Sequence, residues 1–351
     1  MAEDNLPRIA SVIPVLNEQD SIIDCLESLC NQTIANESHL IYVLDGGSTD
    51  STTQVIQDFI DQMGQKSPEI ILLNNPGKHV AEARNLALSK MPKSIHYMLE
   101  VIGHCTLDPG HIQIVVEEFD KLQRENDSKI GALGVKVESK EGPLGLSESW
   151  IEASLSSPLG SSNGQFDNFS GTQRTNVPAF CLHSRLAVEE VGGWDTEFIT
   201  SQDSDLSMRL IKSGYALFRT DLTTVKMTKR TSLNSWFKMG FRYGFWRTKV
   251  VKKHPERASL REFMPWFGLI LTTMLFLLGL DIWYIPPLAY GLAITLEGLR
   301  NTIVKRKVSL LVGLPLSLLI LHVSFSLGLV YGLFGKSRSF NDRDSRNGNI
   351  Q

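Results

Sequence analysis

Carboxylates follow two of the apolar runs in the first fifty residues, and at such positions they can bind polar ligands. The stretch PVLNE (residues 14–18) closes one apolar run, and LDGGSTDST (residues 44–52) closes the next. Ligands of open parallel sheets bind at the carboxyl ends of the strands, so both stretches stand where a ligand would bind. Asp45 can accept hydrogen bonds from the N–H of a uracil-like base or from ribose hydroxyls, and Gly47 allows the chain to turn closely there. The alternative is that DGGST only connects a strand to a helix and supplies the helix cap.

Two later stretches add further charged side chains. NNPGKHVAEARNLAL (residues 74–88) contains Lys78 and Arg84, and a helix arginine that faces the same sheet edge can hold a phosphate or a base carbonyl. A lone arginine on a helix is more often a solvated charge. GGWDTEFITSQDSDLSMRLIKSGY (residues 192–215) contains Asp203 just before a predicted helix. Asp203 is a candidate general base for an attacking hydroxyl, and the competing interpretation is a helix N-cap.

Alternating strands and helices are predicted to position these residues. Apolar runs bounded by turn residues predict strands over residues 8–16, 39–45, 69–74, 95–102, 130–137 and 215–219, and helices over stretches that include residues 19–31, 46–63, 79–90, 110–124 and 204–214. This alternation predicts an α/β fold with a mostly parallel sheet sandwiched by helices. Residues 141–176 are rich in Ser and Gly, which predicts an irregular loop over a site. No GxGxxG follows the first strand and no GxxxxGK[ST] occurs, which disfavours dinucleotide and P-loop sites.

Six stretches, in this order, carry a resemblance to a known family: PVLNE, DGGSTDST, ARNLAL, GGWDTEF, QDSDLSMRLIKSGY and FRYGFWRTKVVKKHP. Over residues 8–334 the chain resembles the family 2 glycosyltransferases, in particular the membrane-anchored branch typified by bacterial exopolysaccharide (succinoglycan-type) glycosyltransferases. The resemblance implies the GT-A fold of nucleotide-diphospho-sugar transferases, a divalent metal (Mg²⁺ or Mn²⁺) and an inverting single displacement. It also implies a nucleotide-diphosphate sugar as the donor, most often a UDP-sugar.

The resemblance also implies roles for individual residues. Asp203 would be the catalytic base, at the second position of the family's usual Glu-Asp pair, which reads Gln202–Asp203 in this chain. Trp194, Asp195 and Asp205 would belong to the loop region that meets the acceptor. The nucleotide-sugar would contact residues at the strand ends and on the third helix, namely Pro14, Val15, Glu18, Asp45, Gly47, Lys78, Arg84 and Gly103.

The metal-binding motif departs from the family pattern. The fourth strand of these enzymes ends in D-x-D, written D-A-H or D-G-H in the branch that this chain resembles, and this chain reads EVIGHC with Ile102 in place of the first Asp. Either Glu100 joins His104 as a ligand, from two residues before Ile102 on the same strand face, or His104 holds the metal with the substrate diphosphate. The third outcome is loss of metal and activity. An altered but working site is the favoured interpretation.

The last third of the chain is basic and then strongly apolar. Residues 263–280, 282–296 and 308–334 contain no Lys, Arg, Asp or Glu, and a helix that spans hydrocarbon takes about 20 apolar residues. Thr224–Glu262 carries eleven Lys/Arg against two Glu, interleaved with aromatic residues. This mixture is typical of a membrane interface, with RNA binding as the rival interpretation. The predicted interface residues are Trp236, Arg242, Trp246, Lys249 and Lys252.

Four segments follow from these patterns: a glycosyltransferase domain (1–230), basic-aromatic interfacial helices (231–262), two to three hydrophobic membrane helices (263–334) and a polar tail (335–351). The excess of Lys and Arg predicts that the interfacial segment and the catalytic domain lie on the cytoplasmic side of an inner or plasma membrane. The four cysteines form no CxxC pair, as expected of reduced thiols. The acidic start MAEDNLPRIA is not typical of a signal peptide.

These features, with the resemblance, predict an inverting glycosyltransferase that moves one sugar to a lipid-linked glycan acceptor at the membrane. The interfacial region lacks the Q-x-x-R-W motif of processive polysaccharide synthases, which favours one sugar per encounter. The expected partners are the donor, a lipid-linked or glycan acceptor and membrane lipids, and not nucleic acid. The alternatives are a catalytically silent nucleotide-sugar-binding or scaffold protein of the same fold and, less favoured, a membrane-tethered nucleic-acid-binding protein.

Overall fold

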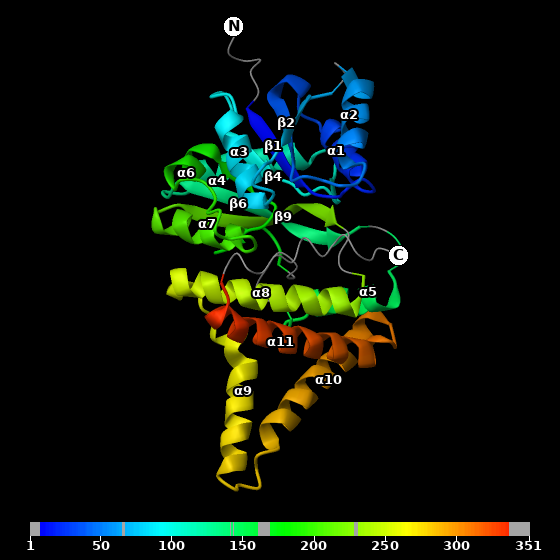
Figure 1. Ribbon diagram of the computed structural model, residues 1–351, viewed down its shortest axis with the longest axis vertical. Helices are drawn as coiled ribbons and strands as arrows, with labels where there is room; N and C mark the ends of the chain where they lie inside the picture. The colour runs from blue at the N-terminus through cyan, green and yellow to red at the C-terminus, as the bar shows by residue number, and fades with distance from the viewer. Residues whose placement is uncertain are drawn as a thin grey trace. The chain divides into compact units, whose positions relative to one another are not determined.

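The computed structural model describes residues 8–64, 67–140, 142, 144–160, 169–227 and 231–336 (Figure 1). The chain divides into two compact units. Unit 1 consists of Met1–Glu141 and Phe169–Thr228, and unit 2 consists of Gly142–Asn168 and Lys229–Gln351. Residues Gly142–Asn168 therefore group with the C-terminal helices, although they lie in the middle of the sequence. The first seven residues and the tail beyond Lys336, on which two of the predictions fall, lie outside the described residues.

Unit 1 is built on one mixed sheet. Its strands are β1 (Ile9–Val15), β2 (His39–Asp45), β3 (Glu69–Asn74), β4 (Tyr97–Glu100), β5 (Cys105–Leu107), β6 (Ile130–Ser139), β7 (Gln173–Arg174), β8 (Leu182–Ser184) and β9 (Ala216–Met227). They lie in the order β3-β2-β1-β4-β8-β6-β9-β5, with β7 beside β9. The strands β3, β2, β1 and β4 are parallel. In the other half of the sheet β8 is antiparallel to β4 and β6, and β5 and β7 are antiparallel to β9.

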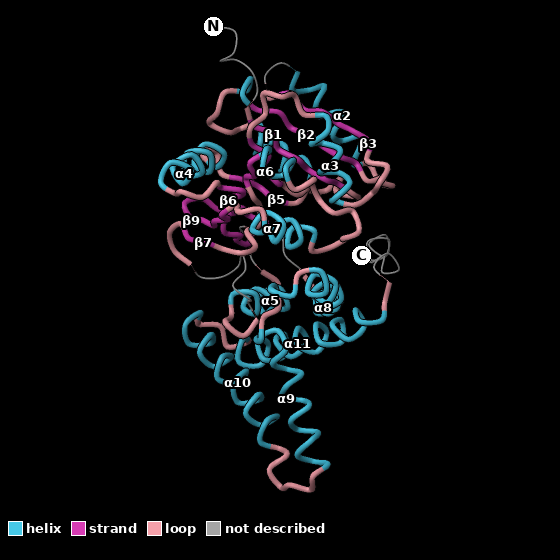
Figure 2. Tube along the Cα trace, turned by 90° about the vertical axis from the view of Figure 1, so that its left-hand side faces the viewer, coloured by secondary structure: helices cyan, strands magenta, loops and turns pink. Residues whose placement is uncertain are grey.

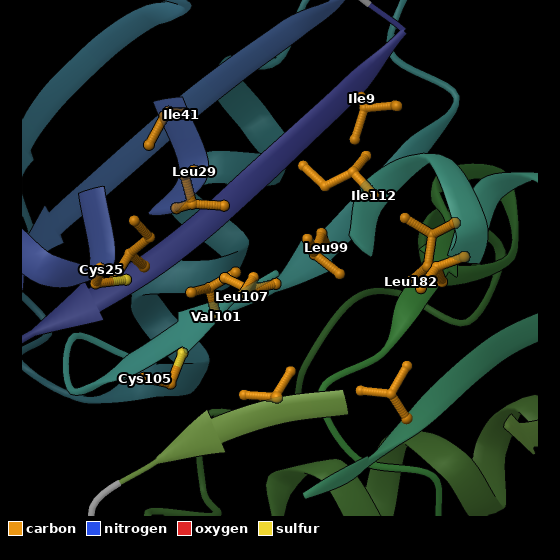
Figure 3. Packing of buried hydrophobic residues seen from close by; sticks show 14 of the residues in the cluster. Ile9, Cys25, Leu29, Ile41, Leu99, Val101, Cys105, Leu107, Ile112 and Leu182 are labelled. Atoms are coloured by element: carbon orange, nitrogen blue, oxygen red, sulfur yellow. The ribbon is translucent and has the colours of Figure 1, made fainter. Parts of the chain in front are cut away.

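Helices pack on both faces of this sheet, which confirms the predicted α/β sandwich. One core contains side chains of α1 (Ile22–Cys30), α2 (Thr52–Met63) and α4 (His111–Glu125), and Figure 3 shows part of it around Cys25, Leu99 and Cys105. The other contains side chains of α3 (Val80–Lys90), α6 (Arg185–Glu190) and α7 (Gln202–Lys212). Strand β1 contributes Ile9 and Ile13 to the first core, and Ala10 and Val12 to the second. Because alternate residues of a strand point to opposite faces, a strand covered on both sides is apolar throughout.

Several elements differ from those that the sequence predicts. Strand β9 runs to Met227, beyond the predicted end at residue 219, and β5 and β8 are strands that the sequence does not predict. Strand β4 ends at Glu100, two residues earlier than expected. Residues 141–176 are not wholly irregular, because Leu146–Ser156 form helix α5 in unit 2 and Gln173–Arg174 form β7. Part of the predicted loop, residues 161–168, lies outside the described residues.

Unit 2 is helical in the residues that the structure describes. Its main helices are α5 (Leu146–Ser156), α8 (Leu233–Lys253), α9 (Leu260–Leu277), α10 (Ile285–Lys305) and α11 (Leu310–Phe334). Helix α5 packs on α11, where a Cβ added to Gly313 would lie 2.1 Å from the ring of Trp150. Helices α9 and α10 leave the layer of α8 and α11 on one side and meet at a loop (Figures 1 and 2). By length and composition, α9 and α11 could each cross a membrane.

The two tryptophans predicted at the membrane interface are buried inside unit 2, so that prediction is wrong for their rings. Trp236 and Trp246 are 0% and 1% exposed, and Nε1 of Trp236 donates to the carbonyl oxygen of Ser317 at 2.9 Å. The large indole rings fill the contact between helices instead of facing lipid. Arg242 and Lys249 are half-buried and Lys252 is exposed.

Candidate active site

The parallel half of the sheet contains a topological switch point. From β1 the chain moves outward to β2 and then β3, and it returns to place β4 on the other side of β1. Such a reversal leaves a crevice outside the carboxyl ends of the two central strands, which is where ligands bind in open α/β sheets. The segments that leave β1 and β4 at this edge contain Glu18 and Gly103–His104.

Glu18 and His104 contact each other at this edge of the sheet. Nδ1 of His104 lies 2.9 Å from Oε1 of Glu18, and their side chains are 32% and 16% exposed. The hydroxyl of Ser21 donates to the other carboxylate oxygen of Glu18 at 2.8 Å. Gly103 permits the close approach, because an added Cβ would lie 3.1 Å from Cγ of Glu18 and 3.3 Å from Cγ1 of Val15. Val15, Glu18, Gly103 and His104, named separately by sequence, thus form one contiguous group.

The loops after β2 and β3 adjoin the same edge. The carboxylate of Asp45 accepts from the backbone N–H of Gly47 at 3.0 Å and of Ser48 at 3.2 Å. Gly47 has a φ of +87°, which favours glycine. A Cβ on Gly46 would lie 2.6 Å from the carbonyl oxygen of Lys78. The hydrogen bonds of Asp45 are those of the strand–turn connector, and its contact with a nucleotide stays a prediction, as it does for Pro14, which is half-buried in β1.

Backbone strain gathers around these loops. Among the described residues, the non-glycine residues with positive φ in unit 1 are Asn17, Lys78, Phe180 and Ser201. Asn17 follows β1, Lys78 follows β3, and Ser201 lies two residues before Asp203. Such conformations cost about 1–3 kcal/mol each and cluster at functional sites, so their positions support this edge as the site.

A buried charge cluster lies behind the end of β4. Nη1 of Arg84 lies 3.1 Å from Oε1 of Glu100, and Nε2 of His183 lies 3.0 Å from the same oxygen. The ring of Trp194 lies below the guanidinium of Arg84 at 5.6 Å and packs edge-on to His183. Burial alone would raise the pKa of Glu100, but the charges of Arg84 and His183 outweigh it and lower the pKa. Glu100 is therefore held as a carboxylate that anchors Arg84.

The location of Glu100 argues against its predicted role as a metal ligand beside His104. Glu100 is 5% exposed and its side chain faces Arg84 and His183, whereas His104 pairs with Glu18. Glu100 and Ile102 also do not share a face as expected, because the strand ends at Glu100. Ile102 packs against the core that contains Cys25 and Cys105.

Another set of possible metal ligands lies around Glu100, but it fits a cation poorly. Glu100, Cys181 and His183 offer atoms within 4.8 Å of one another. Arg84 already lies against the carboxylate oxygen that a metal would need. Burial, followed by the charges of Glu100 and Asp203, raises the pKa of the Cys181 thiol well above its usual value, and a thiol binds metal as the thiolate.

Asp203 stands in the first turn of α7 and is half-buried. Its carboxylate accepts from the backbone N–H of Ser204 at 2.8 Å, and its charge acts on Cys181, next to β8. A helix N-terminus favours a negative charge at this position. The location is compatible with both the base and the capping interpretation.

Two of the predicted acceptor residues are buried and have structural contacts. Asp205 is 0% exposed and pairs with Nε of Arg209 at 2.8 Å, and Arg209 also donates to the carbonyl oxygen of Val191. Trp194 is 2% exposed. Neither side chain therefore offers surface to an acceptor. Asp195 is half-buried and accepts from the backbone N–H of Glu197 at 2.9 Å.

Sequence reasoning gave no role to two residues that organise this region. Asn85 donates to the carbonyl oxygen of Trp194 at 2.7 Å and accepts from its N–H at 2.8 Å. These bonds fasten the GGWD turn to α3. His183 contacts Glu100 and Trp194. The only sequence signal is a histidine within the apolar stretch FCLHSRLAV, and nothing local identifies its partners.

Comparison with known proteins identifies the catalytic class. Residues 11–128 match the model of glycosyl transferase family 2. The chain is 26% identical over 318 residues to the succinoglycan biosynthesis protein ExoA of Rhizobium meliloti, covering 86% of this chain and 90% of that protein. It is 23% identical over 332 residues to a dolichyl N-acetyl-α-D-glucosaminyl phosphate 3-β-D-2,3-diacetamido-2,3-dideoxy-β-D-glucuronosyltransferase of Methanococcus voltae, covering 95% and 99% of the two chains.

The fold matches that of a solved glycosyltransferase. The mannosyltransferase PcManGT of Pyrobaculum calidifontis, solved in complex with GDP-Man and Mn²⁺, superposes with a TM-score of 0.58 over 95% of this chain and 88% of that chain, at 14% identity. At that identity the likeness concerns the fold alone. The chain is thus a glycosyltransferase whose residues 11–128 match the family 2 model and whose fold is of the GT-A type.

Proposed function

We propose that this chain is an inverting glycosyltransferase that transfers one sugar from a nucleotide-diphosphate sugar to a lipid-linked glycan acceptor at the cytoplasmic face of a membrane. The observation that carries the proposal is the group of contacts at the topological switch point, where Glu18 meets His104 and the loops of Asp45 and Lys78 adjoin. The acceptor class is supported by the Methanococcus voltae relative, whose name describes transfer to a dolichyl-phosphate-linked sugar. A UDP-sugar is the favoured donor, and GDP-sugars are the alternative to test, because the Pyrobaculum calidifontis enzyme was solved with GDP-Man.

The pair of Glu18 and His104 fits a divalent metal better than the buried Glu100 group does. A metal-binding histidine usually donates its second ring N–H to a carboxylate, which fixes the tautomer and the ring orientation. With Nδ1 of His104 on Glu18 at 2.9 Å, the Nε2 lone pair is the one left to bind an ion. An imidazole suits Mn²⁺. A bound ion would neutralise charge that develops on the leaving diphosphate.

Asp203 supplies the proposed base. Its carboxylate takes the proton of the acceptor hydroxyl while that oxygen forms a bond to the anomeric carbon of the sugar. The bond between that carbon and the donor diphosphate breaks in the same step, and the nucleoside diphosphate carries away the electron pair. A single displacement of this kind inverts the anomeric configuration. The N-terminus of α7 helps to keep Asp203 ionised before the step.

The experiment is calorimetric titration of UDP and GDP into the purified protein with EDTA, Mg²⁺ or Mn²⁺, for the wild type and His104→Ala. The proposal predicts binding that a metal strengthens and that His104→Ala weakens by about tenfold or more, as for loss of a metal ligand or its supporting contact. Glu125→Ala, which changes an exposed carboxylate at the end of α4, is the control. Absence of binding by either nucleotide under all three conditions would contradict the donor assignment.

Ile102 favours a second candidate, a catalytically silent nucleotide-sugar-binding or scaffold protein. The side chain of Ile102, two residues after the end of β4, packs against the core and cannot bind a cation or a hydroxyl. Under this alternative the protein binds the nucleotide, yet no donor is consumed with any acceptor or metal. Release of nucleoside diphosphate from a donor by the wild type, lost in Asp203→Asn, would exclude it.

A further inference from the structure

We propose that only the α9–α10 hairpin of unit 2 enters the lipid bilayer, and that α11 lies along the membrane surface beside α8. The chain before α9 and the chain after α11 would then be on the same face. This inference concerns unit 2 by itself and does not depend on the transfer of sugar.

Helices α8 and α11 run parallel and pack against each other along their whole length. Nε1 of Trp236 donates to the carbonyl oxygen of Ser317, Oγ1 of Thr248 to that of Leu329, and Nζ of Lys252 to that of Leu333. Each of these pairs is 81 residues apart, so the two helices keep one register from end to end. Glycines allow the backbones to touch, because a Cβ on Gly244 would lie 2.0 Å from the carbonyl oxygen of Phe325, and one on Gly328 2.1 Å from that of Phe241. At whatever depth α11 lies, α8 therefore lies beside it.

The charge on α8 excludes a membrane-spanning orientation for that pair. Helix α8 contains no acidic residue. Its cations are Lys238, Arg242, Arg247, Lys249, Lys252 and Lys253. If α11 crossed the bilayer, several of these cations would be carried into hydrocarbon with it, and charged side chains there are strongly disfavoured. At the surface the exposed cations Lys238, Lys252 and Lys253 can meet lipid phosphates, whereas Arg247 pairs with Glu262 of α9 at 3.2 Å.

The arrangement of the exposed side chains of α11 suits a helix that lies parallel to the membrane surface. Most of them recur every three or four residues and form an apolar stripe, at Val312, Leu316, Leu319, Val323, Leu327, Val330 and Phe334, and the exposed Leu311, Tyr331 and Leu333 widen it at the two ends of the helix. The opposite face contains the buried Leu314, Ser317 and Gly328, which pack on other helices of unit 2. A helix with one apolar stripe and one protein-covered face suits the boundary between headgroups and acyl chains.

The hairpin of α9 and α10 has the opposite character. No residue of α9 is buried, and its 18 residues span about 27 Å at 1.5 Å per residue, close to a hydrocarbon thickness of about 30 Å. The hairpin projects from one side of the α8–α11 layer in both views (Figures 1 and 2). Its loop contains Trp283 and Tyr284, whose rings favour a membrane interface.

The start of α9 and the end of α10, which form the base of the hairpin, are both positively charged. Lys252, Lys253, Arg257 and Arg261 precede or begin α9, against Glu256 and Glu262, and Arg300, Lys305, Arg306 and Lys307 end α10 or follow it, against Glu297, so each end keeps a net positive charge. Segments rich in Lys and Arg stay on the cytoplasmic side of membranes, so these two ends belong to the same face. The occupant of the hairpin surface is accordingly a bilayer that contains anionic lipid.

The test is the labelling of single introduced cysteines in the full-length protein within sealed membrane vesicles, using a membrane-impermeant maleimide. The variants are Lys253→Cys at the end of α8, Asp281→Cys in the hairpin loop and Lys336→Cys after α11, all at exposed positions. The wild type measures the background of the native cysteines, of which Cys25, Cys105 and Cys181 are buried. Lys253→Cys and Lys336→Cys should react from the same side, and Asp281→Cys should not react from that side.

Two results would overturn the proposal. Labelling of Lys336→Cys only from the side opposite to Lys253→Cys would mean that α11 crosses the bilayer. Labelling of Asp281→Cys together with Lys253→Cys in intact vesicles would mean that the hairpin stays outside.

A matched pair of charged substitutions gives an independent measurement. Ile270→Arg lies in α9 and Leu327→Arg on the exposed stripe of α11, at residues that are 59% and 47% exposed. Extraction by alkaline carbonate should rise by about tenfold or more for Ile270→Arg, because an arginine is costly within hydrocarbon. The rise should be below about threefold for Leu327→Arg, whose charged end can reach the headgroups. The reverse order would contradict an in-plane α11.

Discussion

Replacement of Glu100 by glutamine should destabilise unit 1 far more than loss of one hydrogen-bonding group suggests. The carboxylate of Glu100 and the side chain of Arg84 are each 6% exposed, and their nearest charged atoms are 3.1 Å apart. Removing one member of such a pair leaves the other charge buried without compensation, which costs about 3–5 kcal/mol. Glutamine keeps the shape, so the loss comes from the charge and not from a cavity.

The assay is thermal or urea unfolding of the detergent-solubilised protein at neutral pH. A loss of about 3 kcal/mol in a unit of this size lowers Tm by about 6–12 °C. Glu189→Gln is the control, since Glu189 also pairs with an arginine, Arg185, at 2.8 Å but is 43% exposed. An exposed pair of this kind contributes about 0–1 kcal/mol.

Two further results bear on the reasoning. The double variant Glu100→Leu with Arg84→Met removes both charges and should recover much of the lost stability. Because the pKa of Glu100 is lowered on folding, its contribution is complete above the pKa of an unfolded glutamate and is lost as pH falls through the folded pKa. If Glu100→Gln proved as mild as Glu189→Gln, the cluster would not be the anchor of Arg84.

Three more predictions follow from single contacts. Asp203→Asn should abolish transfer and leave nucleotide affinity within about twofold, measured by donor turnover and calorimetry, because only the proton acceptor is lost; residual turnover with weakened binding would contradict the base assignment. Burial lowers the pKa of His39 to about 3, so unfolding binds a proton and this histidine alone should lower stability by about 2 kcal/mol between pH 6.5 and pH 5; His39→Gln, which keeps a group able to bond Ser11, should remove that share in urea titrations and leave the share of His111, whose pKa burial lowers to about 4. Asn85→Ala removes both bonds to the backbone of Trp194 and should cost about 1–3 kcal/mol in unfolding experiments, whereas an unchanged midpoint would mean that the turn is held by other contacts.

The strands of the parallel half could be predicted from the sequence because the sheet is covered on both faces. Residues 39–45 and 69–74 form strands with the predicted bounds, and their apolar runs end at polar turns. The sequence predicts too long a strand β4, because the apolar residues Val101 and Ile102 continue the pattern of a buried strand. The chain leaves the sheet at Glu100, where the carboxylate meets Arg84 and His183 from distant segments.

Helix α5 and the two tryptophans of α8 show where local patterns mislead. LSESWIEASLS is rich in serine and reads as a loop, yet Ser149 and Ser154 are buried, and small side chains permit close packing on α11. Trp236 and Trp246 alternate with cations as interfacial residues do, but their rings pack inside unit 2. In both cases the partner helix follows much later in the chain and could not be inferred from the local pattern.

The site could be predicted in part, through motifs whose residues adjoin strand ends. Glu18 and His104 were both named, although their mutual contact was not. No role can be predicted for Asn85 from the sequence, because its partner Trp194 lies about a hundred residues away. The same holds for His183, because no local pattern points to its partner Glu100. The assignments of nucleotide, metal and base remain predictions that the experiments above test.

The packing of unit 2 also imposes an order on its biosynthesis. Ser154 of α5 and Ser317 of α11 are hydrogen-bonded although 163 residues separate them in the chain. Trp236 of α8 also bonds Ser317, which is synthesised 81 residues later. The hairpin leaves the ribosome before α11 does, so it can insert while α5 and α8 still lack their common partner. Until α11 is complete, the surfaces that it covers stay exposed and prone to aggregation. A chain that stops before Leu310 should therefore need a chaperone or be degraded, even though every residue of the sheet is present.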